Sequence, residues 1–208
     1  MSEQPTVVVA GHAERTVDPD RFSITGDVSV RAADSTAALG ELAQRFATLD
    51  HAVLALGADG ITVERGAVHS YGEGGRLRRW NAGRSLSVTC TDTARATEVA
   101  QVFERVPDVQ LNGPFWQVDR ANPAYDGAQS DAVRDARARA ERYAVALGGE
   151  LGRLVELRDQ GTSAPMHFAA AMRAKGEAFD GGLELIDLSP QQQTISASVE
   201  ARWYLVLP

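Results

Sequence analysis

The 208-residue chain has little cysteine and no long hydrophobic run, and each absence excludes a class of protein. Its single cysteine, Cys90, cannot form an internal disulfide or supply a cysteine metal cluster. No apolar run approaches the roughly 20 residues that span a bilayer, so we expect no membrane insertion. The N-terminal sequence MSEQPTVVVAG lacks the basic start and apolar core of a signal peptide. This predicts a cytoplasmic protein, unless a leader was removed from an exported one.

The chain also lacks an excess of positive charge. It has 21 lysine and arginine residues against 28 aspartate and glutamate residues, a formal net charge of −7. Nucleic acids and anionic membranes are bound by basic surfaces, so we expect no nucleic-acid partner. The one basic-aromatic cluster, formed by Arg76, Arg78, Arg79 and Trp80, is interpreted as a solvated strand end rather than a site for single-stranded nucleic acid.

Local signatures of common enzymes are missing as well. The glycine-rich sequence YGEGGR does not have the form of a phosphate-binding P-loop and is typical of a hairpin turn. The sequence GRSLS at Gly83 lacks the second glycine of a nucleophile elbow. Cys90 shares the apolar face of its predicted strand with Leu86 and Val88, which predicts a buried, unreactive thiol. The chain has four histidines, His12, His51, His69 and His167. None of them has the local spacing of a zinc site. We therefore expect no catalytic, cofactor-binding or metal-binding residues.

Strand periodicity is present along much of the chain. Phe22, Ile24, Val28 and Val30 alternate with polar residues, which is typical of a strand with one buried and one solvated face. Further strands are predicted over residues 7–14, 61–71, 77–91, 109–118, 151–157 and 195–207, with a bend at Gly113-Pro114 in the fourth of these.

Three segments have helix periodicity. The first begins at the N-cap Asp34 and ends at Gly57, and the second begins at Asp92 and ends before Pro107. The third begins at Asn122 and ends at the glycines that follow Leu147. Its apolar stripe is rich in alanine, so this helix can lie close to the sheet it covers; the stripe contains Tyr125, Ala128, Ala132, Ala136, Ala140, Tyr143 and Leu147.

These patterns predict an α+β fold, a largely antiparallel sheet with helices packed on one face. The length suits a single domain over residues 1–208. Regular periodicity lapses over residues 160–189, and such a segment is generally mobile or functional. Met166, Phe168 and Met172 lie within it and predict an interaction surface, because methionine adapts to varied partners and exposed apolar patches mark contact sites. Folding of these three residues back onto the same domain is the alternative.

Three stretches together resemble the SIMPL-domain family, whose bacterial members include YggE-like proteins. They are VVVAGHAERTVDPDRFSITGDVSV, SDAVRDARARAERYAVALGGELGRLVEL and the closing ISASVEARWYLVL. The resemblance implies an α+β fold, no established enzymatic activity and no agreed catalytic residues. It also implies a link with protection from oxidative stress, and homo-oligomers in some members. Bacterial members are often exported, whereas this sequence lacks an export signal.

The predicted function is that of a non-enzymatic protein acting through self-association or protein contacts. We expect a homo-oligomer without cofactors, with exposed strand edges and the segment from Met166 to Met172 as contact surfaces. The alternative is a small-ligand binding domain, or an undetected enzyme, with a pocket between the helices and segment 160–189.

Overall fold

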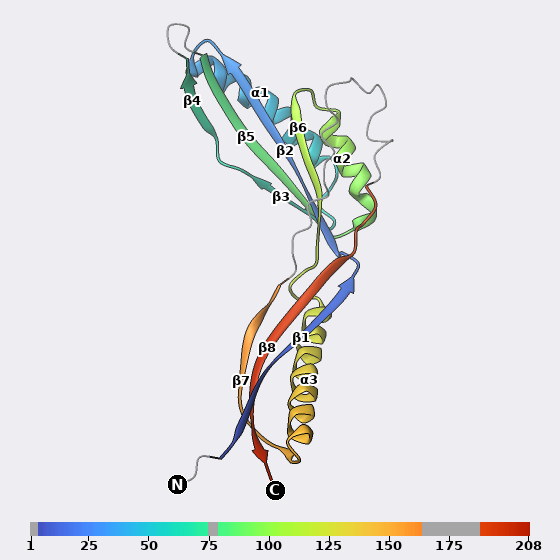
Figure 1. The fold of residues 1–208 in the computed structure, drawn as a ribbon. Helices are drawn as coiled ribbons and strands as arrows, with labels where there is room; N and C mark the ends of the chain where they lie inside the picture. The colour runs from blue at the N-terminus through green and yellow to red at the C-terminus, as the bar shows by residue number, and fades with distance from the viewer. Residues whose placement is uncertain (1–3, 75–78, 164–187) are drawn as a thin grey trace, which may run out of the picture. The chain divides into compact units, whose positions relative to one another are not determined.

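The computed structural model describes residues 4–74, 79–163 and 188–208, and its helices and antiparallel sheets form the predicted α+β fold (Figure 1). The contacts divide the chain into two compact units. The chain passes from the first unit to the second between Asp18 and Pro19, and back again between Gln117 and Val118. Each unit has its own sheet, its own helical cover and its own apolar core.

The first unit is a three-stranded antiparallel sheet covered by one helix. The strand order is β1 (Thr6–Val17), β8 (Gln193–Val206), β7 (Glu150–Ser163). β1 and β8 pair without interruption, from Thr6 opposite Tyr204 to Val17 opposite Gln193. Helix α3 (Pro123–Ala146) packs on one face, more over β1 and β8 than over β7 (Figure 1).

The core of this unit is built from small residues, which allow α3 to approach the sheet closely. Gly11 of β1 lies directly under the helix: a Cβ atom there would stand 2.6 Å from the backbone nitrogen of Ala136 and would also collide with the carbonyl oxygen of Ala132. The fully buried helix residues are all alanines, namely Ala128, Ala132, Ala136, Ala140 and Ala144.

The ends of α3 are those predicted, but its buried stripe is not. The Asn122 side chain accepts a hydrogen bond from the Ala124 N–H at 3.0 Å, and Gly148 has the positive φ of 74° that ends the helix. The prediction that Tyr143 and Leu147 continue the stripe is wrong, because both are exposed and Ala144 is buried instead. The buried alanines follow a strict four-residue step, whose row is inclined to the helix axis.

The second unit has a five-stranded antiparallel sheet. β3 (Ile61–Arg65) and β4 (His69–Glu73) both pair with β5 (Arg79–Cys90), which is followed by β2 (Arg21–Ala32) and β6 (Val109–Gln117). One face is covered by α1 (Ser35–Leu54) and by α2 (Ala96–Glu104), which follows a turn of 3-10 helix, η1 (Thr93–Arg95) (Figure 1). The N-caps Asp34 and Asp92 accept hydrogen bonds from the N–H groups of Ala37 and Ala94, as predicted.

Large side chains fill the core of the second unit. The rings of Phe22 and Trp116 pack edge to face with their centroids 5.5 Å apart. The alternating residues predicted to be buried in β2 are buried. The predicted bend in β6 is confirmed by a cis peptide bond at Gly113-Pro114 and by a register shift opposite β2.

Two predicted strands have different limits. The strand predicted over residues 61–71 is two strands, because Gly66, Ala67 and Val68 lie opposite only two residues of β5 and form a bulge. β7 continues to Ser163, so residues 160–163 are strand rather than irregular. A turn within the strand interrupts the alternation of apolar and polar residues there. In this turn Asp159 Oδ1 accepts a hydrogen bond from the Gly161 N–H at 2.8 Å.

Candidate functional site

The two edges of the sheet in the first unit differ in their contacts with α3. At the edge formed by β1, the His12 backbone N–H donates to Asp135 Oδ2 at 3.0 Å, and Arg15 Nε donates to Asp131 Oδ2 at 2.7 Å. The bond from His12 lowers the pKa of the Asp135 carboxyl, and the bond from Arg15 lowers the pKa of Asp131. Acidic side chains of the helix therefore occupy part of this edge.

At the edge formed by β7, Gln129 Nε2 of α3 donates to Thr162 Oγ1 at 3.0 Å, but no described side chain of α3 hydrogen-bonds residues 154–157. Leu154, Val155 and Leu157 are 49%, 42% and 46% exposed. Leu154 lies opposite Trp203 and Leu157 opposite Ala201, so both leucines are on the face that α3 covers elsewhere. They remain exposed because α3 lies toward β1. We call these three residues, with the backbone that carries them, the β7 edge.

Charged residues alternate with these apolar residues along the same strand. Glu156 and Arg158 lie opposite Arg202 and Glu200 of β8, on the face away from α3. The register of β7 is irregular after Leu151, after Leu154 and after Asp159, but it is regular over residues 156–159. Bulges limit pairing along an edge, so this short regular stretch is the part of strand β7 best able to add a strand.

A histidine and a serine lie together on the outer face of the same sheet, and an aspartate of α3 lies at the adjoining edge of β1. His12 Nδ1 and Ser198 Oγ are 2.7 Å apart, on directly paired residues of β1 and β8. Asp135, however, binds the His12 backbone N–H and not the imidazole ring. In a Ser-His-Asp triad the carboxylate orients the ring of the base, so this cluster does not have triad geometry. The three residues are far apart in sequence, and no local spacing could have indicated the cluster.

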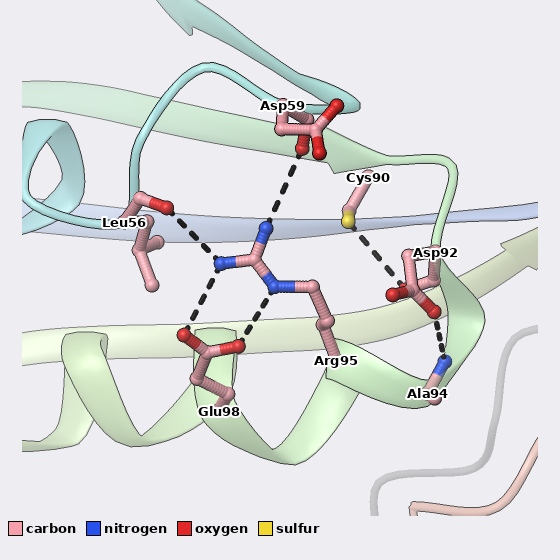
Figure 2. A network of polar contacts seen from close by, with 7 residues as sticks. All are labelled: Leu56, Asp59, Cys90, Asp92, Ala94, Arg95 and Glu98. Atoms are coloured by element: carbon pink, nitrogen blue, oxygen red, sulfur yellow. Dashed lines mark hydrogen bonds and ion pairs between the residues drawn. The ribbon is translucent and has the colours of Figure 1, made fainter.

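A second polar network surrounds Arg95 in the second unit (Figure 2). Its Nε and Nη2 donate to the Glu98 carboxylate at 2.7 and 3.1 Å. Nη2 also donates to the Leu56 carbonyl at 3.1 Å, and Nη1 to the Asp59 carbonyl at 3.4 Å. The hydrogen bond from Arg95 lowers the pKa of the Glu98 carboxyl. Arg95 thus ties the start of α2 to the chain that leaves α1, which is a structural role.

Cys90 lies beside this network and is fully buried, as predicted. Its Sγ is 3.5 Å from the Asp92 carbonyl oxygen (Figure 2). A thiol enclosed in this way has little access to oxidants or electrophiles.

The residues predicted to form an interaction surface, Met166, Phe168 and Met172, lie outside the described residues. So do His167 and most of segment 160–189, which the predicted ligand pocket would require. Within the described ranges, no group of three or more acidic, histidine or cysteine side chains could hold a metal ion. In the same part of the chain, no helix is both long enough and apolar enough to cross a membrane.

Comparison with solved structures gives a partial match to a protein from Burkholderia cenocepacia described as a "putative amidohydrolase/peptidase". The sequence identity is 14% and the TM-score is 0.26, which supports no argument about fold or activity. The match covers 52% of this chain and 29% of that one.

No curated protein matches the chain. A family model does match, over residues 7–203, and is described as "SIMPL: Protein of unknown function (DUF541)". The matched range covers nearly the whole chain and both units, in agreement with the three stretches that resemble this family. The chain belongs to the SIMPL family.

Proposed function

We propose that this SIMPL-family chain is non-enzymatic and acts by self-association through the β7 edge. The observation that supports the proposal is the exposure of Leu154, Val155 and Leu157 along the strand that α3 covers least. An edge strand offers a row of backbone donors and acceptors to a second chain, and adjacent apolar side chains add area to bury.

The sequence of β7 suits pairing with a second copy of itself. Antiparallel pairing around a twofold axis at Leu157 sets Leu157 against its own copy and Glu156 against Arg158. Each dimer can then form two cross-strand pairs of opposite charge, worth roughly 0.2–1 kcal/mol each, in competition with the ion pairs that Arg158 forms with Glu156 and Glu200 within each chain. Complete burial of a leucine contributes about 1.5–3 kcal/mol, and less here because Leu157 is already half buried.

Molar mass measured by light scattering after size exclusion tests the proposal. We expect the intact 22.3 kDa chain to be oligomeric and the Leu157→Arg variant to have a lower mass. Leu54→Arg is the matched control, because Leu54 is 56% exposed on α1 of the other unit, and this variant keeps the wild-type mass. A monomeric wild-type chain at micromolar concentration would contradict the proposal.

Variants that exchange the charges of Glu156 and Arg158 test whether residues 156–158 form the interface. Glu156→Arg and Arg158→Glu each place like charges opposite one another in the proposed pairing, and we expect each to weaken the oligomer. The double variant restores opposite charges and is expected to restore the mass. If both single variants keep the wild-type mass, the chains do not pair through residues 156–158.

Met166, Phe168 and Met172 form a second proposed contact surface. We expect the triple substitution to serine also to lower the oligomer mass of the otherwise intact chain. An unchanged mass in the triple variant would remove this surface from the proposal and leave the β7 edge.

The family resemblance implies a link with protection from oxidative stress. We propose that any such protection comes from contacts with other proteins and not from chemistry at the thiol of Cys90. The support is the complete burial of Cys90. A thiol reagent is expected to label the native chain slowly and the urea-unfolded chain rapidly. Rapid labelling of the native chain would instead make Cys90 a candidate for redox chemistry.

A further inference from the structure

An arginine occupies a position of β5 where its neighbours are core residues. Ala82, Leu86 and Val88 of this strand are buried on the face covered by α1. Arg84 lies in the same alternating row and is paired with the buried Val28 of β2. Charged residues on a core-facing row are rare unless they form an ion pair or have a function. The position of Arg84 is therefore unusual.

Part of the Arg84 side chain is held by the fold. Its Nε donates to the Gly66 carbonyl at 2.9 Å, and its Cζ lies 4.2 Å from the centroid of the Phe46 ring. These contacts stabilise the bulge between β3 and β4 and stack the guanidinium on α1. Within the described part of the chain, neither terminal amino group of Arg84 has a hydrogen-bond acceptor. No described residue occupies those donors.

A hollow of about 360 Å³ lies beside this guanidinium, between α1 and the strands next to it. Its volume is at the lower end of the roughly 300–1,000 Å³ found for small-molecule sites. One wall comes from the exposed face of α1, where Leu39 is 39% exposed. The lining residues are Leu39, Leu42, Ala43, Phe46, Ala47, Asp50, Arg65, Val68 and Arg84.

The charges of this lining favour an anion. Arg65 binds Asp50 Oδ1 through Nε at 2.8 Å and through Nη2 at 2.6 Å, so these two charges offset one another. Of the two arginines and one aspartate in the lining, Arg84 therefore supplies the remaining positive charge. A planar guanidinium whose two amino groups bind no described residue matches the geometry of a carboxylate.

We propose that the hollow beside Arg84 binds a small monocarboxylate with an apolar tail, such as a medium-chain fatty acid. Arg84 receives the carboxylate, and the tail lies against Leu39, Leu42 and Val68. This site lies wholly within the second unit and does not depend on self-association through the β7 edge. A monomeric chain that binds the carboxylate would overturn the proposed assembly and leave the ligand site intact.

Calorimetric titration of the full chain with octanoate tests the proposal. We expect a Kd of about 0.1–1 mM, the weak range for a small and open site. Acetate lacks the tail and methyl octanoate lacks the charge, so both are expected to bind at least tenfold more weakly. No octanoate binding, or equal binding of methyl octanoate, would overturn the proposal.

Variants separate the roles of the arginine and the apolar wall. Arg84→Met keeps an unbranched stem against Phe46 and is expected to weaken octanoate binding at least tenfold. Leu39→Gln makes the wall polar at an exposed position and is expected to weaken binding severalfold. Leu54→Gln, on the same helix but outside the lining, serves as the matched control and binds as the wild type does. Unchanged binding by both Arg84→Met and Leu39→Gln would place the carboxylate elsewhere.

Discussion

The two units cover their sheets by opposite means. In the first, α3 presents alanines to β1 and β8, and Gly11 removes even a Cβ atom from the contact. In the second, large side chains such as Phe22, Phe103 and Trp116 fill the space under two helices. Small residues bring a helix close to its sheet, whereas large residues contribute more apolar area. The first unit should therefore be sensitive to added atoms and the second to removed atoms.

The largest expected effect is the removal of a large side chain from the second unit. Phe103 is fully buried, and its ring lies over Gly26 of β2. Phe103→Ala should lower the free energy of unfolding by about 4 kcal/mol, because it loses apolar burial and leaves a cavity. Urea unfolding followed by circular dichroism measures the loss. Val102→Ala, at the partly buried neighbouring position, should cost much less, and equal losses would contradict the comparison.

Next in size is the addition of one methyl group to the first unit. Gly11→Ala should destabilise the protein by about 2–3 kcal/mol, because the new Cβ meets the backbone of α3 at Ala132 and Ala136. Gly40→Ala is the matched control, since nothing lies within 4 Å of the added atom on α1. Alanine is the better helix former, so Gly40→Ala should raise stability by up to about 1 kcal/mol. Equal unfolding midpoints for the two variants would show that the close contact is relaxed in solution.

The smallest expected effect concerns the edge of β1. The pKa of Asp135 is lowered in the folded protein, first by the hydrogen bond from the His12 N–H. Its contribution to stability is therefore present above the unfolded pKa near 3.9, and it is lost as the pH falls through the folded value. Asp135→Ala should cost about 1 kcal/mol or less at pH 7, since the side chain is partly exposed, and nothing at a pH below both values.

Glu14→Ala provides the comparison for Asp135→Ala, because Glu14 is an exposed residue of β1, the strand whose edge Asp135 of α3 binds. Stability curves of both variants between pH 2 and 7 distinguish them: only the curve of Asp135→Ala should converge on the wild-type curve at low pH. Parallel curves for both variants would show that the Asp135 bond contributes nothing to stability.

Local features of the fold could be predicted from the sequence, because they depend on neighbouring residues. The alternation in β2, the caps at Asp34 and Asn122 and the bend at Gly113-Pro114 all belong to this group. Alternation shows which side of a strand is buried but not which strands share a sheet. The division into two sheets therefore had no local signal, nor did the bulge at Gly66, which depends on its pairing with Ser85.

The two candidate sites also differ in how far the sequence could predict them. Exposed strand edges could be predicted only as a class, because exposure of Leu157 depends on where α3 lies across the sheet. Arg84, by contrast, did have a signal in the sequence. It stands two residues before Leu86 in a row that continues through Val88 to Cys90, so a charge falls where alternation calls for an apolar residue.

The pairing of β1 with β8 has a consequence for the order in which the units can form during synthesis. Residues 19–117, which contain all the described strands and helices of the second unit, leave the ribosome as one continuous stretch. β1 leaves the ribosome before them, yet its partner β8 follows them in the chain, with Thr6 opposite Tyr204. Domains generally fold as they are synthesised. We therefore expect the second unit to begin folding on the nascent chain while β1 waits unpaired, so that the sheet of the first unit closes only after β8 has been translated.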